Sequence, residues 1–404
     1  MKVLAVLRGT EWPRRDRVVL WGGAILVEQV LMFACVILWA FGVFGTSRPP
    51  IASDFPSFYG AGTLVWAGTP HLAYDQAAHW QAERAAGGAN VPYTYFFYPP
   101  PYLLLCAALA CLPYMVAYVL FEAATLVLYV LVTRRIAAIG GWAWAVPALA
   151  FPAVYWTLGL GQNALLTASI FGAATFLTDS RPGRAGVLFG LLSYKPHFGL
   201  LVPLALAAGG HWRVFFSAAA TVAGLIAVTT ALFGVDTWRD YLTAFAASGS
   251  VYASGKIMLA GYVTAYGAAR LIGLAHEAAL GVQVMASLVV AVIVVRLWYR
   301  GASLPLRAAA LLAGTVLSVP LALLYDLLLV GVCVAWLARA ARETGLLPWE
   351  KAAMLTIYLI SLVSLFVGLA LKIPLGPLAP AIVLVLCVRR AARESRGGER
   401  PAAA

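Results

Sequence analysis

The chain has 404 residues, of which 63% are hydrophobic and 11% charged, and its mean hydropathy is +0.88. A soluble globular domain is about half apolar and about a quarter charged, so this composition excludes a water-soluble globule and indicates an integral membrane protein. The net charge of +12 comes from arginines and lysines that gather in short clusters between apolar runs. Such clusters are typical of topology signals and argue against a nucleic-acid-binding surface.

Repeated apolar runs predict an all-α polytopic membrane protein, because lipid offers no partner for unpaired backbone groups and the alternation of barrel strands is absent. The first run lacks a cleavage site for a signal peptide and is expected to remain as a helix. The five cysteines show neither metal-ligand spacing nor a disulfide framework. The expected helices lie near residues 18–44, 114–133, 142–158, 163–178, 213–234, 276–298, 303–319, 321–341, 352–371 and 375–390.

Lys195 and Pro196 divide one further apolar stretch, residues 185–209. Two short helices that meet at the outer surface would bring the total to about twelve membrane helices, within a range of about 10 to 13. A single span there would invert the topology of everything that follows.

Clusters of basic residues predict which ends of the helices are cytoplasmic, and they predict a cytoplasmic location for both termini. These residues are Arg14, Arg15, Arg17, Arg134, Arg135, Arg181, Arg184, Arg213, Arg296, Arg300, Arg307, Arg339, Arg342, Arg389, Arg390 and Arg393.

The whole chain, 1–404, is therefore expected to form a single integral membrane domain. Its parts are a first transmembrane helix (18–44), a large extracytoplasmic loop (45–113), core transmembrane helices (114–234), a second extracytoplasmic loop (235–275), C-terminal transmembrane helices (276–390) and a cytoplasmic basic tail (391–404). Residues 57–67 and 71–84 of the first loop are expected to form short interfacial helices.

Polar residues from four distant segments fall on the outer side of this topology. Ionisable groups at mid-bilayer cost about 2.5–3.5 kcal/mol, so they tend to face a cavity that they serve. The sequence therefore predicts an external polar pocket. Its expected members are Asp54 in the first loop, Gln162 and Asn163 at an outer turn, Lys195 and His197 at the outward bend, and Tyr325 and Asp326 in a helix that begins near Pro320.

Three of these positions also have a purely structural interpretation. Asp54 could cap a helix in the loop. Gln162 and Asn163 could satisfy the end of a helix. Lys195 could extend its charged end from a buried stem to the lipid headgroups.

Two further positions also leave alternatives open. Asp326 could form a structural ion pair with Lys195 or Arg270. His197 and His71 could be interfacial polar residues, because no second histidine or carboxylate stands at metal-ligand spacing.

Five motifs occur in an order that resembles glycosyltransferase family 87, whose members are membrane enzymes of the GT-C class. The resemblance covers roughly residues 50–330, and the last helices match only in general character. A His-rich stretch found in some members after a Ser-Pro pair is absent, and Ser318, Pro320, Tyr325 and Asp326 stand in that region. The motifs are SDFPSFYGAGTLVWAGTPHLAYD, FFYPPPYLLLCAALACLP, LGQNALLTASIFGAATFL, GVLFGLLSYKPHFGLLVPLAL and SVPLALLYDLLLV.

The resemblance implies a GT-C-type fold and an inverting glycosyltransferase. Such an enzyme transfers a sugar, with mannose as the expected one, from a polyprenyl-phosphate carrier to a hydroxyl of a glycolipid, polysaccharide or other extracytoplasmic acceptor. It also implies a bacterial cytoplasmic membrane location with the active site on the extracytoplasmic side. Membrane lipids are the other expected partners, and nucleic acid is not expected.

The resemblance further assigns Asp54 as the general base. Lys195 is expected to contact the donor phosphate, with Arg270 or Lys256 as alternatives. Gln162 and Asn163 are expected to bind phosphate or sugar hydroxyls, and Asp326 to orient the acceptor or the lysine. Tyr325, Tyr59 and His197 complete the expected substrate-binding set. No cofactor or metal is expected, because the chain has no DxD motif and no Gly-rich phosphate loop.

Two other functional classes compete with this interpretation. A secondary transporter or lipid flippase is suggested by the helix number, although transporters often show repeated halves and midplane sites, and no repeat is visible here. A structural membrane protein would have no reason to gather these polar residues in one place.

Overall fold

The computed structural model describes residues 7–12, 14–40, 53–141, 145–255 and 257–398. Within these residues the regular secondary structure is helical, and the only β pairing is an isolated antiparallel bridge between Tyr262 and Leu323. The α-helices from α2 onward are α2 (Arg15–Ala40), α3 (Phe55–Trp66), α4 (Gln76–Gly87), α5 (Pro101–Leu109), α6 (Tyr114–Ala137), α7 (Ala145–Leu149), α8 (Pro152–Leu160), α9 (Ala164–Leu177), α10 (Pro182–Leu191), α11 (Val202–Ala208), α12 (Trp212–Ala253), α13 (Ala265–Leu271), α14 (His276–Tyr299), α15 (Leu304–Leu317), α16 (Leu328–Thr344), α17 (Glu350–Leu371) and α18 (Leu378–Gly398).

In the described part of the chain, six helical segments are long and apolar enough to cross a membrane, and they confirm a polytopic all-α protein. They are Arg15–Trp39, Tyr114–Ala137, Trp212–Ala253, His276–Tyr299, Leu324–Thr344 and Glu350–Leu371. Shorter apolar helices cover Ala164–Leu177, Pro196–Ala208 and Leu304–Leu317. The expected total of about twelve crossings and the boundaries of the loops stay predictions.

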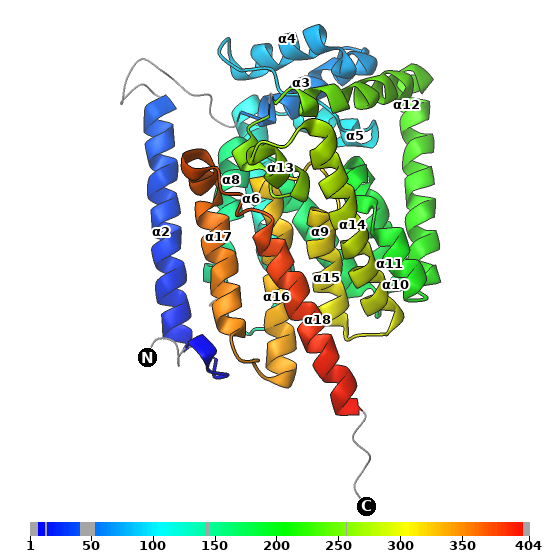
Figure 1. Cartoon of the computed structure of the whole chain (residues 1–404). Coiled ribbons are helices and arrows are strands. Elements are labelled where there is room, and N and C mark those ends of the chain that lie inside the picture. Colours follow the sequence, from blue (N-terminus) through cyan, green and yellow to red (C-terminus); the bar gives the residue numbers. More distant parts are fainter. Residues whose placement is uncertain (1–6, 13, 41–52, 142–144, 256, 399–404) are drawn as a thin grey trace, which may run out of the picture.

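The helices are arranged with a clear difference between the two ends of the molecule (Figure 1). Helix α2 begins and α18 ends at one end, whereas α3, α4 and α5 cover the opposite end. Helix α2 stands at the edge of the bundle, where Gln29 donates a hydrogen bond to the Ala150 carbonyl oxygen, 2.8 Å away. The first expected transmembrane helix therefore exists from Arg15, and its last residues, 41–44, lie outside the described residues.

Helix α12 changes direction at Gly234, whose backbone has φ 82° and ψ 163°. Glycine adopts this conformation without the steric cost that a side chain would bring. The part before Gly234 runs along the bundle, and the part after it crosses the end covered by α3 (Figure 1). The segment 235–275, expected as a loop, thus contains a helix up to Ala253 and the short helix α13.

Prolines explain the other interruptions. Pro152 separates α7 from α8, so the expected helix 142–158 is two short helices within the described part. The stretch 185–209 is divided at Lys195 as expected: α10 continues into the 3-10 turn η3 (Leu192–Tyr194), then the 3-10 turn η4 (Pro196–Gly199) leads to α11. Proline disfavours a helical conformation in the residue before it, and Lys195 has φ −121° and ψ 71°.

The centre of the bundle is formed by α15 and α16, which are buried along almost their whole length. Helix α16 packs against α15 and α6, and Gly331 allows the Tyr129 side chain to approach it closely. The 3-10 turn η6 (Leu324–Leu327) precedes α16 directly. Any side chain on η6 therefore sits at the end of a helix that is buried along almost its whole length.

Candidate active site

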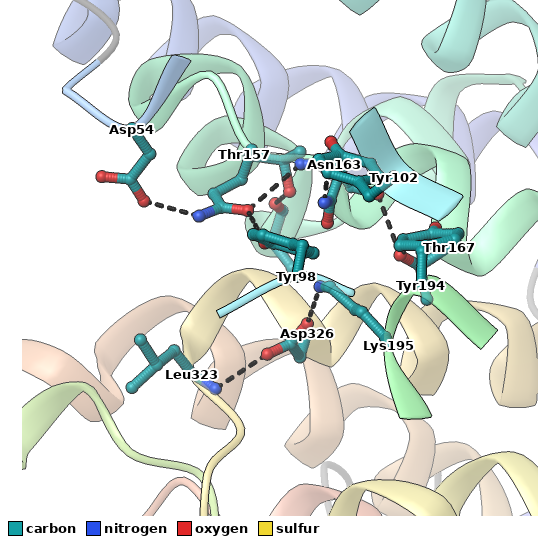
Figure 2. A network of polar contacts seen from close by, with 12 residues as sticks. Asp54, Tyr98, Tyr102, Thr157, Asn163, Thr167, Tyr194, Lys195, Leu323 and Asp326 are labelled. Atoms are coloured by element: carbon teal, nitrogen blue, oxygen red, sulfur yellow. Dashed lines mark hydrogen bonds and ion pairs between the residues drawn. The ribbon is translucent and has the colours of Figure 1, made fainter. Parts of the chain in front are cut away.

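Asp54 precedes α3 and is attached to the turn between α8 and α9 (Figure 2). Its carboxylate accepts hydrogen bonds from Gln162 Nε2 at 2.7 Å and from Ser53 Oγ at 3.1 Å. Its backbone N–H donates to the Leu160 carbonyl oxygen at 2.9 Å. Asp54 occupies the N-cap position of α3, but its side chain makes no capping hydrogen bond to that helix. One of the two residues that hold the carboxylate, Gln162, is 108 positions away in the chain.

The turn that carries Gln162 depends on Gly161, which has φ 70°. Gln162 Oε1 accepts hydrogen bonds from the Asn163 backbone N–H at 3.2 Å and from the Tyr98 hydroxyl at 3.4 Å. Asn163 Nδ2 donates to the Tyr102 hydroxyl at 2.9 Å, and Asn163 Oδ1 is buried without a hydrogen-bond partner among the described residues. The Gln162 side chain thus contacts Asp54, whereas the Asn163 side chain contacts Tyr102.

Lys195 and Asp326 form a buried ion pair (Figure 2). The Lys195 Nζ atom lies 3.1 Å from Asp326 Oδ1, and the two residues are only 4% and 5% exposed. Asp326 Oδ2 accepts the Leu323 backbone N–H at 3.0 Å. Nζ also lies over the rings of Phe198 and Tyr325, 5.3 and 5.6 Å from their centroids.

These contacts decide between the interpretations left open for both residues. Lys195 is not extended to the headgroups, and Asp326 pairs with it, whereas Arg270 donates to the carbonyl oxygens of Leu274 and Ala253. Asp326 and Tyr325 lie on the 3-10 turn before α16, not inside a helix that begins near Pro320. The carboxylate accepts the N–H that opens this turn, which explains the difference.

A column of tyrosines connects the Asp54 side of the site to the Lys195 side (Figure 2). Tyr98 stacks on Tyr102 with ring centroids 4.4 Å apart, and Tyr102 stacks on Tyr194 at 5.2 Å. Burial raises the pKa of the Tyr98 phenol, and the neighbouring carboxylates of Asp326 and Asp54 raise it further. Tyr98 therefore lies between two carboxylates that come from opposite parts of the chain.

The environment of Asp54 raises the pKa of its carboxyl group. Burial is the main cause, and the negative charge of Glu83 acts in the same direction. The hydrogen bonds from Gln162 and Ser53 and the positive charge of Lys195 lower it in part. A carboxylate with a raised pKa is a stronger base than one in water, and Asp54 remains partly exposed.

Sequence reasoning missed a buried group of residues that contacts Ser53 and Ser57, on either side of Asp54 in the chain. His79 and Glu83 of α4 are both fully buried, with His79 Nε2 3.2 Å from Glu83 Oε1 and 3.0 Å from Ser57 Oγ. Both Glu83 carboxylate oxygens accept the Thr94 backbone N–H, and the Thr94 hydroxyl donates to the Ser53 carbonyl oxygen at 3.2 Å. The spacing of four between His79 and Glu83 was the available signal, since it places both on one helix face.

Two of the expected residues are not part of this network, and a third cannot be placed relative to it. Tyr59 donates its hydroxyl to the Leu112 carbonyl oxygen and packs edge-on against Tyr114, 5.3 Å away. His197 is half-buried and its ring lies 4.4 Å from that of Phe198. Lys256 lies outside the described residues.

Potential metal ligands do not cluster in the part of the chain that the structure describes. No group of three or more His, Cys, Asp or Glu side chains lies together there in a way that could hold an ion. The expectation of metal-independent chemistry stays a prediction.

Comparison with known proteins identifies the family. The family model described as glycosyltransferase family 87 matches residues 96–325, which is more than half of the chain. The match includes Tyr98, Gln162, Asn163 and Lys195, ends one residue before Asp326, and begins after Asp54. No curated protein and no solved structure matches the chain. An all-α polytopic chain with this match belongs to glycosyltransferase family 87.

Proposed function

We propose that the protein transfers a sugar, with mannose as the expected one, from a polyprenyl-phosphate carrier to a hydroxyl of an extracytoplasmic glycolipid or polysaccharide, with inversion at the anomeric carbon. Membership of family 87 supports glycosyl transfer as the reaction class. The observation that carries the finer proposal is the network that brings Asp54, Gln162, Tyr98, Lys195 and Asp326 to one place.

In this proposal Asp54 is the general base. The acceptor oxygen attacks the anomeric carbon while its proton passes to the Asp54 carboxylate, and the bond from that carbon to the phosphate oxygen breaks. A positioned base of this kind contributes about 10²- to 10⁴-fold to the rate. Gln162 holds one carboxylate oxygen and Ser53 the other, so each oxygen keeps a further lone pair for the incoming hydroxyl.

Lys195 is proposed to stabilise the departing polyprenyl phosphate. Its ammonium group has three N–H donors, and one of them is directed at Asp326. The remaining donors can contact phosphate oxygens, where a positive charge stabilises the negative charge that develops on the leaving group. Asp326 then acts as a positioning residue that holds the ammonium in place.

We also propose that this site faces the outside of the bacterial cytoplasmic membrane and that both termini are cytoplasmic. The end of the bundle opposite α3–α5 carries Arg134 and Arg135 in the last turn of α6 and Arg342 in the last turn of α16. The Arg342 guanidinium donates to the carbonyl oxygens at the end of α6, so these basic residues share one end. An excess of basic residues is typical of cytoplasmic ends.

The proposal of Asp54 as base is tested with Asp54→Asn in purified protein supplied with polyprenyl-phosphate mannose and a glycolipid acceptor. We expect transfer to fall by at least about 10²-fold, because the amide cannot take the proton. Asp236→Asn is the matched control. Asp236 is an exposed carboxylate on α12, and among the described residues its ion pair is with Arg239. Full activity of Asp54→Asn would exclude Asp54 as the base.

A secondary transporter or flippase is not favoured by these observations. The candidate site is formed by the segment between α4 and α5, the α8–α9 turn, Lys195 and η6, and the family match concerns glycosyl transfer.

A further inference from the structure

The segment that joins α4 to α5 has two faces with different surroundings. Thr94, Phe96 and Tyr98 point inward: Thr94 hydrogen-bonds to Ser53 and Glu83, Phe96 is 2% exposed, and Tyr98 faces the candidate site. Alternate residues of a non-helical, extended segment point to opposite sides. The side chains between them, at positions 93, 95 and 97, accordingly form the other face.

The outward face is a continuous row of aromatic rings, which we call the aromatic track and define as Tyr93, Tyr95, Phe97 and Tyr252. The ring centroids of Tyr93 and Tyr95 are 4.8 Å apart, and Tyr95 and Phe97 are stacked at 5.4 Å with an angle of 11°. Phe97 meets Tyr252, at the end of α12, at 6.1 Å. All four rings are partly exposed.

The aromatic track ends beside the candidate site. Tyr252 is fixed by the Tyr266 hydroxyl, which donates to its carbonyl oxygen at 3.3 Å. Phe97 is followed by Tyr98, whose hydroxyl donates to Gln162 Oε1 of the candidate site at 3.4 Å. The row of rings thus leads from α4 to the residues around the proposed base.

The charges at the Tyr93 end of the track bear on the class of ligand there; at the other end, the Arg270 guanidinium donates to the carbonyl oxygen of Ala253, next to Tyr252. The charged groups near Tyr93 are the carboxylates of Glu83 and Asp75, which would repel a phosphate or an anionic lipid headgroup. The Tyr93 and Tyr95 hydroxyls make no hydrogen bond to any described residue, and a prenyl chain would leave them without partners. A neutral sugar offers C–H faces for the rings and hydroxyls for the phenols.

We propose that the aromatic track binds the sugar rings of the acceptor, so that the acceptor is a neutral glycan or carries one. This inference rests on the proposed function, in which an acceptor hydroxyl must reach Asp54. Each ring that stacks on the track adds affinity, and the last ring is presented to the site. The track determines which acceptors bind, whereas Asp54 determines whether they react.

The test measures carbohydrate binding without turnover. The probes are the neutral tetrasaccharides mannotetraose, maltotetraose and cellotetraose, titrated into detergent-purified Asp54→Asn protein without donor. We expect at least one of them to bind and Tyr95→Leu to weaken that binding about tenfold, the loss expected for one aromatic stacking contact. Tyr95→Phe should weaken it less. Tyr299→Leu, which removes an exposed ring at the far end of α14, should leave it unchanged.

Three results would overturn the inference. They are failure of all three tetrasaccharides to bind, equal affinity in the Tyr95→Leu protein, and a loss in Tyr95→Leu that appears only as weaker association with phosphatidylglycerol vesicles. The last result would identify the track as a membrane-interface belt. The binding assay needs no sugar transfer, so a negative result in it is distinguishable from failure of the proposed function. The proposed function is tested separately, by measuring sugar transfer with the Asp54→Asn protein.

Discussion

The hydrogen bond from Gln162 to Asp54 predicts a shift in the pH dependence of transfer. Gln162→Met removes a 2.7 Å donor from the carboxylate while keeping the side-chain length. A hydrogen bond to a charged group contributes about 1.5–3 kcal/mol, and one pKa unit corresponds to about 1.4 kcal/mol. Since Asp54 is partly exposed, we expect the lower end of that range and a rise in the pKa of Asp54 of about one unit.

The direction follows from the proposed role of the Asp54 carboxylate as general base. A general base is inactive when protonated, so kcat/KM falls as the pH falls through the pKa of Asp54. Burial already raises that pKa, which places the acid limb of the profile above the usual aspartate value of about 3.9. Gln162→Met should move this limb to higher pH by about one unit and leave the plateau at high pH largely intact.

A second variant should move the limb in the opposite direction. Glu83 raises the pKa of Asp54, so Glu83→Gln removes a negative charge and should lower it. The amide oxygen of the new side chain can still accept the Thr94 N–H. The assay is kcat/KM for sugar transfer between about pH 4 and 9, with the exposed Gln81→Met as control. Limbs that coincide in Gln162→Met and the parent protein would refute the reasoning.

Two further predictions concern stability and are measured as thermal unfolding in detergent. Lys195→Met leaves the buried Asp326 carboxylate without its cation and should destabilise the protein by about 3–5 kcal/mol. Adding Asp326→Asn should restore much of this stability without restoring transfer. An unchanged unfolding midpoint in the single variant would contradict the buried pair. Gly62→Ala would place a methyl group well inside contact distance of the Cys106 carbonyl oxygen, so α3 and α5 must separate at about 1–3 kcal/mol, whereas Gly224→Ala, with nothing near it, should be neutral or stabilising. Equal midpoints for the two alanine variants would rule out the close approach.

The sequence predicted the membrane class and the gathering of Asp54, Gln162, Lys195 and Asp326, because apolar length and basic clusters place each motif at one end of a helix. It did not predict the hydrogen bond between Gln162 and Asp54, and it left Lys195 and Arg270 as alternative partners of Asp326. Hydrogen-bond partners such as Asp54 and Gln162 are over 100 residues apart, and local patterns carry no information on that pairing. The prediction of Asp326 inside a helix failed for a local reason, since the Asp326 carboxylate accepts the Leu323 N–H and the turn forms around it.

Two other features had weaker signals. The part of α12 after Gly234 is a helix too polar for a membrane span, and hydropathy alone cannot separate such a surface helix from a loop. The His79–Glu83 pair had a helical spacing, but nothing in the sequence indicated that it would be fully buried and in contact with Ser57.

The double attachment of Asp54 to the α8–α9 turn has a consequence for product linkage. Its main chain is bonded to Leu160 and its side chain to Gln162, so the carboxylate has little freedom to swing. A sugar acceptor offers several hydroxyls of similar acidity, and a fixed base cannot search among them. Regioselectivity must then come from the orientation of the bound acceptor. Substitutions of the residues around the site should therefore change which acceptor hydroxyl receives the sugar before they change the rate of transfer.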